Sequence, residues 1–228
     1  MRYSEFENIL SKARMSRYLS SCGGNSRKAM TLYRLNLRLS QGLLTIISCF
    51  EVALRNSINL HCLTMGSDWL RDGARNGGGG IFDNHNCRLT AININDAVQK
   101  LNTNYSHNKL VAELGFGFWR YMFAHHQYTA TGRNLLKIFP SKPISTPAIQ
   151  YNHTYIFNQL AMINNLRNRV AHHEPICFQI GNTIKCTNYA RQHYSIICQL
   201  FQWMNIDESA LLYGIDHIYI ICNKIDAL

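Results

Sequence analysis

The sequence is poor in charged residues, and its cysteines lie in no pairing pattern. Charged side chains make up 16% of the 228 residues, whereas about a quarter is usual in soluble proteins. Because 46% of the residues are hydrophobic, a largely disordered chain is excluded. The eight cysteines show no Cys-x-x-Cys pair and no zinc-type Cys/His spacing, so we expect reduced thiols and no metal site.

Long apolar runs and targeting signals are also missing. The longest strongly apolar run, residues 42–53, contains Thr45, Ser48 and Glu51 and is shorter than the roughly 20 residues of a membrane helix. The N-terminus is charged throughout and has no apolar segment of the kind found in secretory signals. We therefore expect a soluble, cytoplasmic protein that does not associate with membranes.

Acidic residues are the scarcer of the two charged kinds. Lysine and arginine number 23 against 13 aspartates and glutamates, which gives a formal charge of +10. A basic chain attracts polyanions. Nucleic acid is therefore the first class of partner to consider.

Helical periodicity dominates the sequence and predicts an all-α fold in a single domain, 1–228. Residues 3–19 predict one short amphipathic helix, and the turn that follows offers Asn25 or Ser26 as a helix N-cap. A long helix with one buried stripe is predicted from about residue 30 to residue 63. Further helices are predicted over 92–105 and 110–128.

Glycine and proline predict two interruptions. Four consecutive glycines occupy positions 77–80, so residues 73–86 are expected to form a mobile surface loop. Three of the four prolines fall within residues 139–147, which predicts a rigid connector. Alternating apolar residues around Gly181 predict one small β-hairpin over 178–186, followed by two helices.

Residues 148–173 are the most informative part of the chain. An apolar stripe at helical spacing predicts a helix that ends before Pro175, with His172 in its last turn. A helical wheel places Arg167 within the apolar sector, on the buried face. Asn168 and His172 share the neighbouring stripe, so the three side chains should converge near the helix end.

The long helix carries Glu51 in its own apolar stripe, with Arg55 at the edge. Buried charges are costly unless they are paired or used. In one interpretation, Glu51 and Arg167 form a buried structural ion pair, while His172 and His173 cap a helix. In the other, Arg167 meets a phosphate, His172 transfers protons, and Glu51 orients Arg167.

The spacing alone carries little weight, because Arg120 and His125 repeat it. There, Tyr121 stands where Asn168 follows Arg167. Arg120 and His125 are therefore a weaker second candidate pair.

The surrounding sequence is more specific. The run NNLRNRVAHHEPI (164–176) resembles the signature of the Abi-like (abortive-infection) family within the HEPN superfamily of helical RNases. The motif of that superfamily is Arg, a polar residue, three variable residues and His, here Arg167, Asn168 and His172. The segments FEVALRNSI (50–58) and ELGFGFWRYMF (113–123) resemble the same family, and the resemblance covers about residues 10–215. The four glycines and Arg120 depart from the pattern.

The resemblance implies an all-α HEPN-type bundle with helical elaborations, which dimerises so that two motifs face a shared RNA cleft. The implied activity is metal-independent endoribonucleolytic cleavage through 2′-OH attack, without a cofactor, leaving a 2′,3′-cyclic phosphate. His172 would act as general base or acid, Arg167 would stabilise charge and Asn168 would fix orientation. Supporting or capping roles fall to Glu51, Arg55, His173 and Glu174.

The resemblance also implies a toxin or phage-defence effector restrained by a cognate antitoxin, either a protein or a small non-coding RNA. The charge of +10 favours an RNA partner. The candidate RNA-binding cations are Arg14, Arg17, Arg27, Lys28, Arg34 and Arg38, for which a solvated helix face is the alternative. The rival function is a non-catalytic RNA-binding HEPN module or scaffold, in which Arg167→Ala and His172→Ala would change affinity but abolish no cleavage.

Overall fold

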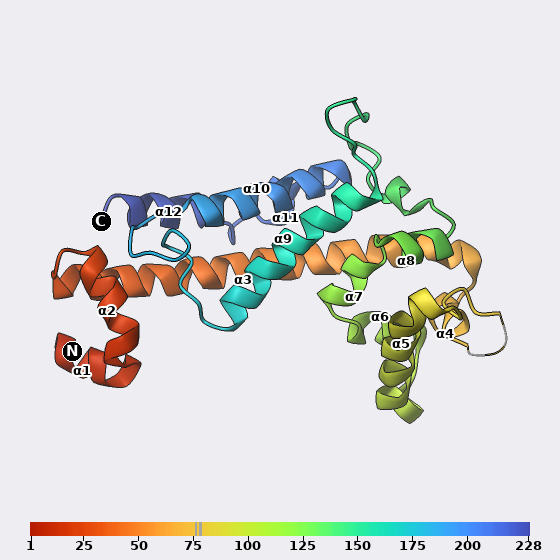
Figure 1. Cartoon of the computed structure of the whole chain (residues 1–228), viewed down its shortest axis with the longest axis horizontal. Coiled ribbons are helices and arrows are strands. Elements are labelled where there is room, and N and C mark those ends of the chain that lie inside the picture. The colour runs from red at the N-terminus through yellow and green to blue at the C-terminus, as the bar shows by residue number, and fades with distance from the viewer. Residues whose placement is uncertain (76, 78) are drawn as a thin grey trace. The chain divides into compact units, whose positions relative to one another are not determined.

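The structure is all-α, as predicted. The computed structural model describes residues 1–75, 77 and 79–228, and 68% of it is helix against 1% strand (Figure 1). The chain divides into two compact units: the first holds residues 1–48, 165–199 and 207–228, and the second holds residues 49–164 and 200–206. Three long helices contribute residues to both units, namely α3 (Ser26–Cys62), α9 (His153–Ala171) and α10 (Asn188–Trp203).

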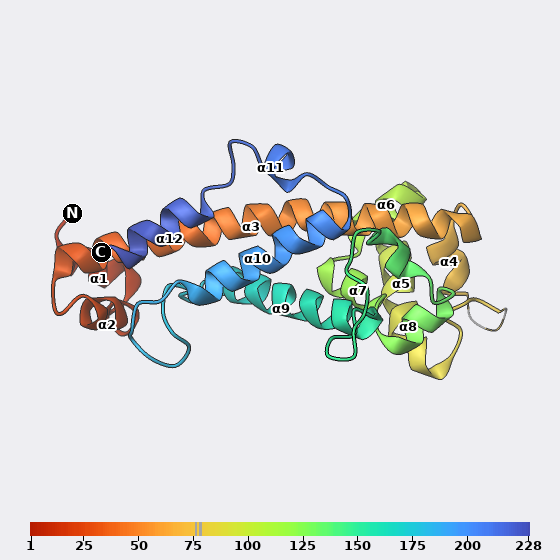
Figure 2. The same cartoon turned by 90° about the horizontal axis from the view of Figure 1, so that it is seen from above.

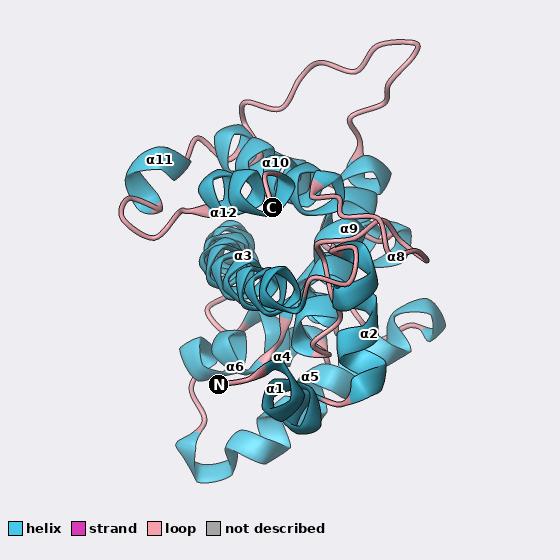
Figure 3. Cartoon of the chain, turned by 90° about the vertical axis from the view of Figure 1, so that its left-hand side faces the viewer, coloured by secondary structure: helices cyan, strands magenta, loops and turns pink. Residues whose placement is uncertain are grey.

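The first unit is built on the N-terminal part of α3. It adds α1 (Tyr3–Leu10), α2 (Lys12–Ser21), α11 (Glu208–Leu211) and α12 (Ile218–Asp226). Helix α12 lies along α3 (Figures 2 and 3) so closely that a Cβ atom at Gly42 would stand 3.0 Å from Ile218 Cδ1. The ring of Tyr33 on α3 contacts those of Phe6 and Tyr18, at centroid distances of 5.5 and 5.2 Å. These aromatic contacts hold α1 and α2 against α3.

The predicted helix over residues 3–19 is wrong, because the chain breaks at Ser11. This residue has φ of 75°, and its Oγ accepts a hydrogen bond from the Arg14 N–H at 3.3 Å. Ser11 therefore ends α1 and caps α2. The prediction for Asn25 is confirmed, since its Oδ1 accepts from the Lys28 N–H at 3.0 Å and α3 begins at the next residue.

The second unit contains the remainder of α3 and five short helices. These are α4 (Trp69–Gly73), α5 (Arg88–Leu101), α6 (His107–Glu113), α7 (Phe116–Tyr121) and α8 (His125–Ala130). Four 3₁₀ turns join them, at Leu63–Met65, His85–Cys87, Asn102–Asn104 and Leu135–Ile138. The helix predicted over 92–105 thus begins earlier, at Arg88, and gives way to a 3₁₀ turn at Asn102.

The single helix predicted over residues 110–128 is wrong, because the chain forms three helices there. The backbone is extended at Leu114 and Gly115, and again at Ala124, where ψ is 151°. The apolar pattern of this segment nevertheless fills the core, as predicted, because Trp119 and Phe123 are completely buried. Burial here is achieved by short helices that change direction.

The glycine-rich segment is only partly a surface loop. Within the predicted range 73–86, Asn76 and Gly78 lie outside the described residues. Phe82 is completely buried, and its N–H donates to the Gly73 carbonyl at 2.9 Å. A Cβ atom at Gly80 would stand 2.5 Å from that same carbonyl oxygen. Glycine is therefore required at position 80, and the surface prediction is wrong for Phe82.

The proline-containing connector and the turn around Gly181 both lie at the predicted positions. The proline-containing residues 139–152 hold no helix, and most of their side chains are exposed. In the first unit, Phe178 and Lys185 form one antiparallel bridge around Gly181, whose φ is 81°. The predicted hairpin is thus reduced to a single bridge.

Helix α3 is unusually apolar. With the turn that follows it, Ser26–Met65 is the one helical stretch of the described chain that is long and apolar enough to cross a membrane. It passes this test although its longest apolar run, residues 42–53, is shorter than a membrane helix. The core helix of a soluble protein passes the same test, and α3 buries a full stripe of side chains. The completely buried ones are Ala29, Leu32, Leu39, Leu43, Ile46, Ile47, Phe50, Leu54 and Ile58.

Candidate functional site at the end of helix α9

The last turn of α9 exposes the three residues of the predicted motif. The apolar stripe of α9 is buried, as predicted, but Arg167, Asn168 and His172 are all exposed. The prediction that Arg167 lies on the buried face is wrong. On a helical wheel, Val170 lies roughly 80° away from Leu160, so the buried sector turns along the helix and leaves Arg167 on the solvent side.

The helix ends in a hydrogen-bonded cap directly after the motif. The His172 N–H still donates to the Asn168 carbonyl at 2.9 Å, so these two side chains lie one helical turn apart on the same face. His173 then adopts φ of +56°. Its N–H donates to Val170 O at 3.0 Å, and the Glu174 N–H donates to Arg169 O at 2.9 Å. This is the Schellman arrangement, with histidine at the left-handed position usually taken by glycine.

Side chains from α2, α3 and α9 hold the segment that follows the cap. Arg169 donates from Nε to Glu174 Oε2 and from Nη2 to the Pro175 carbonyl, both at 3.0 Å. Arg14 on α2 donates to the His173 carbonyl. The buried side chain of Asn36 on α3 accepts from the Ile176 N–H at 2.9 Å. The end of α9 is therefore fixed from several directions.

The motif side chains themselves are not bonded to other described residues. Across the described part of the chain, Arg167, Asn168 and His172 have no hydrogen-bond or ion-pair partner. A guanidinium matches the geometry of a phosphate, and an imidazole can transfer protons near neutral pH. The fixed helix end thus presents a cation, an amide and an imidazole to an external ligand.

A comparison with known protein families shows the family of the chain. The family model described as Abi-like protein matches residues 1–177. The chain belongs to the Abi-like family. This membership suggests a role in abortive infection. No curated protein and no solved structure matches the chain.

The predicted supporting residues of this Abi-like protein fall into two groups. His173 and Glu174 form the cap itself, as the capping interpretation predicts. Glu51 and Arg55 belong to the second unit, where Arg55 Nη1 donates to the Ala112 carbonyl at 3.4 Å. The exposure of Arg167 excludes the buried ion pair of the first interpretation. Orientation of Arg167 by Glu51 stays a prediction.

The N-terminal cations of the Abi-like protein mostly contact its own chain. Arg17 donates to the carbonyls of Gln179 and Asn182, at 3.1 and 3.0 Å, and its guanidinium lies 4.5 Å from the ring of Phe178. Arg14 is bound to His173, Lys28 to the Leu228 carbonyl and Arg34 to the ring of Phe6. Arg27 and Arg38 are exposed and make no such contact with the described residues.

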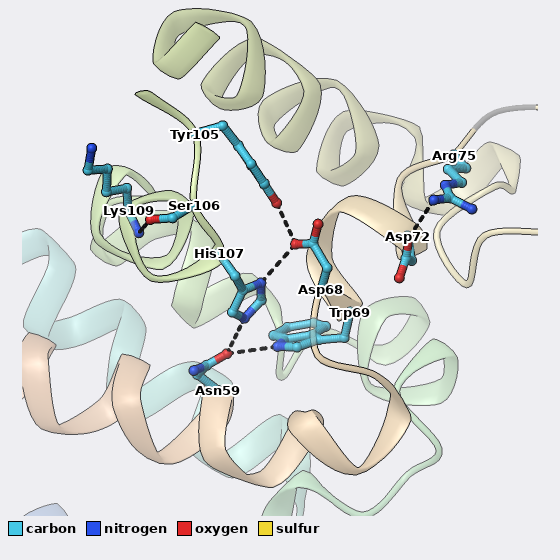
Figure 4. A network of polar contacts seen from close by, with 9 residues as sticks. All are labelled: Asn59, Asp68, Trp69, Asp72, Arg75, Tyr105, Ser106, His107 and Lys109. Atoms are coloured by element: carbon cyan, nitrogen blue, oxygen red, sulfur yellow. Dashed lines mark hydrogen bonds and ion pairs between the residues drawn. The ribbon is translucent and has the colours of Figure 1, made fainter. Parts of the chain in front are cut away.

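The second unit contains a polar network that no sequence pattern predicts (Figure 4). Asn59 Oδ1 accepts from Trp69 Nε1 at 2.9 Å and lies 2.7 Å from His107 Nε2. Asp68 accepts from the Tyr105 hydroxyl and lies 3.0 Å from His107 Nδ1. Burial and the bond to Asp68 raise the pKa of Tyr105.

The ring nitrogens of His107 and Trp69 in this network all have partners. The network therefore stabilises the end of α3 and offers no open site. The residues that bond to one another in it lie 10 to 48 positions apart in sequence. No local motif could have revealed them. The described residues also contain no cluster of three or more His, Cys, Asp or Glu placed to hold a metal ion.

Proposed function

We propose that this Abi-like protein is an endoribonuclease of the HEPN type that acts as a toxin or phage-defence effector in abortive infection. The observation that carries the proposal is the free, exposed set of Arg167, Asn168 and His172 at a helix end that other side chains hold in place. The structural role at this helix end falls instead to Arg169, two residues away, which is bonded to Glu174 and to the Pro175 carbonyl.

The proposed reaction needs an RNA 2′-hydroxyl. Its oxygen attacks the adjacent phosphorus, the P–O5′ bond breaks, and a 2′,3′-cyclic phosphate and a 5′-hydroxyl result. His172 accepts the 2′-OH proton or donates one to the leaving 5′ oxygen. Arg167 neutralises the charge that develops on the phosphorane-like transition state, and Asn168 orients the phosphate. DNA lacks the nucleophile and is not cut.

A second copy of the chain completes the proposed site. In an in-line displacement the attacking 2′ oxygen and the leaving 5′ oxygen lie on opposite sides of the phosphorus, so two motifs facing each other in a homodimer would divide the roles of base and acid. The formal charge of +10 suits an RNA substrate and an antitoxin made of small non-coding RNA, since many lysines and arginines can each neutralise a phosphate. A protein antitoxin is the alternative.

The test compares wild type with Arg167→Ala/His172→Ala under tight induction in bacteria. Wild type is expected to arrest growth and fragment RNA, and the double variant to do neither. The matched control is His85→Ala/Arg88→Ala, which removes another exposed histidine and arginine and should remain toxic.

Purified protein then cuts an RNA oligonucleotide in EDTA but leaves its 2′-deoxy counterpart intact, and mass spectrometry detects the cyclic phosphate. Cleavage that survives the double variant would overturn the proposal. A discrete RNA retained by both proteins without cleavage would instead identify a non-catalytic RNA-binding module.

A further inference from the structure

The chain contains a long stretch without acidic residues. No aspartate or glutamate occurs between Glu113 and Glu174. The same stretch carries six lysines and arginines and five histidines. An unopposed basic stretch produces a positive potential that attracts polyanions. Part of it is the motif of α9, and another part lies in the second unit.

In the second unit this stretch forms a surface of aromatic and cationic side chains on α7, α8 and the beginning of α9. We name it the Arg120 surface, and it comprises Arg120, Tyr121, His125, His126 and Phe157. The Arg120 guanidinium lies 4.2 Å from the ring centroid of Phe157 and 5.2 Å from that of Tyr121. Tyr121 meets Phe157 edge-on at 5.5 Å and stays 50% exposed.

Two exposed imidazoles extend this surface. The rings of His125 and His126 lie 5.2 Å apart. The ring of His153 lies 5.8 Å from that of His125. It stacks on the ring of Tyr128 at 4.5 Å, and its Nδ1 lies 3.0 Å from the Phe123 carbonyl oxygen. These two contacts fix the position of His153 next to His125. Adjacent histidines in a helix cannot both reach one metal ion with good geometry, so a metal is the wrong ligand class.

The Arg120 surface carries positive charge that its surroundings do not neutralise. Within the described residues Arg120 has no ion-pair partner, and its Nε is buried without a hydrogen-bond acceptor. Arginine stacked on an aromatic ring and next to an exposed tyrosine is a combination that suits nucleic acid. The guanidinium contacts a phosphate, while the ring offers a face to an unpaired base.

We propose that the Arg120 surface binds single-stranded RNA, with a base stacked on Tyr121 and a phosphate held by Arg120. The inference rests on the proposed function only in taking RNA as the polyanion. The bases of duplex RNA are already stacked on one another, and so they cannot stack on Tyr121. The surface therefore selects unpaired segments.

The test measures RNA affinity in a full-length chain that carries Arg167→Ala/His172→Ala, so that cleavage does not interfere. The probes are a fluorescent 12-nucleotide oligouridylate and a duplex RNA of the same length. Tyr121→Ala is expected to weaken binding of the single strand about tenfold, which is the size of one lost stacking contact, and to leave duplex binding unchanged. Tyr121→Phe is expected to restore the affinity.

The matched control is Tyr213→Ala, because Tyr213 is 89% exposed in the first unit. It should bind the single strand like the parent. Equal affinities of Tyr121→Ala and Tyr213→Ala, or equal losses for single strand and duplex, would overturn the proposal. A Tyr121-dependent affinity in a wild-type chain that cuts no RNA would sustain this inference while refuting the proposed nuclease.

A second measurement needs no substitution in the surface and thus avoids loss of folding. An oligonucleotide with 5-iodouridine is irradiated with the chain, and the adduct is mapped by mass spectrometry. An adduct at Tyr121 or Phe157 supports the proposal, whereas adducts found only outside the Arg120 surface contradict it.

Discussion

Two segments of this chain share the pattern Arg-x-x-x-Ala-His-His, at 120–126 and 167–173, yet they fold differently. In the second segment, α9 continues unbroken through Ala171, so Asn168 and His172 share one face. In the first, α7 ends at Tyr121 and α8 begins at His125. Equal spacing gives equal geometry only along a continuous helix.

The arginines of the two segments also have different surroundings. Arg120 stacks on the ring of Phe157, whereas Arg167 is exposed and unpaired among the described residues. Arg169 supplies the bonds that hold the end of α9, and this leaves Arg167 free to bind a ligand. The same pattern therefore belongs to the proposed RNA-binding surface in one place and to the proposed reactive site in the other.

The largest expected difference between the two segments is in catalysis. His172→Ala should lower kcat for RNA cleavage at least about 100-fold, because it removes the proton-transfer group. His125→Ala should leave kcat unchanged and raise KM, because it only loosens RNA binding. Single-turnover and steady-state cleavage assays separate the two constants. Similar losses of kcat in both variants would mean that the two segments act alike.

A smaller difference concerns stability within α9. Arg169→Ala should lower the free energy of unfolding by about 1.5 kcal/mol, because it removes hydrogen bonds from a charged group to Glu174 and Pro175. Arg167→Ala should change it by less than about 0.5 kcal/mol, as expected at an exposed position. Urea unfolding followed by circular dichroism measures both, and a larger loss in Arg167→Ala would contradict the assignment.

Replacing the second histidine of each segment by glycine should change the stability of the chain in opposite directions. His173 has φ of +56°, so His173→Gly should stabilise the chain by about 0.5–1 kcal/mol, because glycine adopts this conformation without steric cost. His126 lies within α8, so His126→Gly should destabilise it by about 0.5 kcal/mol, because glycine has the lower helix propensity. Thermal melting of the two variants measures both changes. The melting temperature should rise in His173→Gly and fall in His126→Gly, and a shift in the same direction in both would contradict the prediction.

The smallest expected effect is a pH dependence next to the α9 cap. Burial lowers the pKa of His193, and the charge of Arg169 adds to this, although a bond to the Tyr189 carbonyl partly opposes it. The folded state therefore binds fewer protons than the unfolded chain near pH 6.5. Stability should be highest above that pH and should fall as the pH drops through it.

The control for this pH dependence is His193→Gln, which does not titrate. Its free energy of unfolding should vary less between pH 7.5 and 5.5 than that of wild type. An identical variation in both proteins would show that His193 does not contribute.

Local signals in the sequence were sufficient for the helix class and for several boundaries. The buried stripe of α9, the N-cap at Asn25 and the end of α9 before Pro175 all follow from interactions within one or two turns. The motif itself was visible because its residues lie within six positions. The breaks at Ser11 and Ala124 were missed, because the apolar pattern continues across both of them.

The sequence by itself determined an all-α fold, its apolar stripes and the presence of Arg167, Asn168 and His172 at a helix end. Only the tertiary structure decided that these side chains are exposed and free, and that Arg14, Asn36 and Arg169 hold the cap beside them. The physical reason is the distance in sequence over which each interaction acts. Helix hydrogen bonds and periodicity join residues three or four positions apart. The burial of a side chain and the bonds of the cap depend on residues that are far apart in sequence, such as Arg14 and His173, which are 159 positions apart.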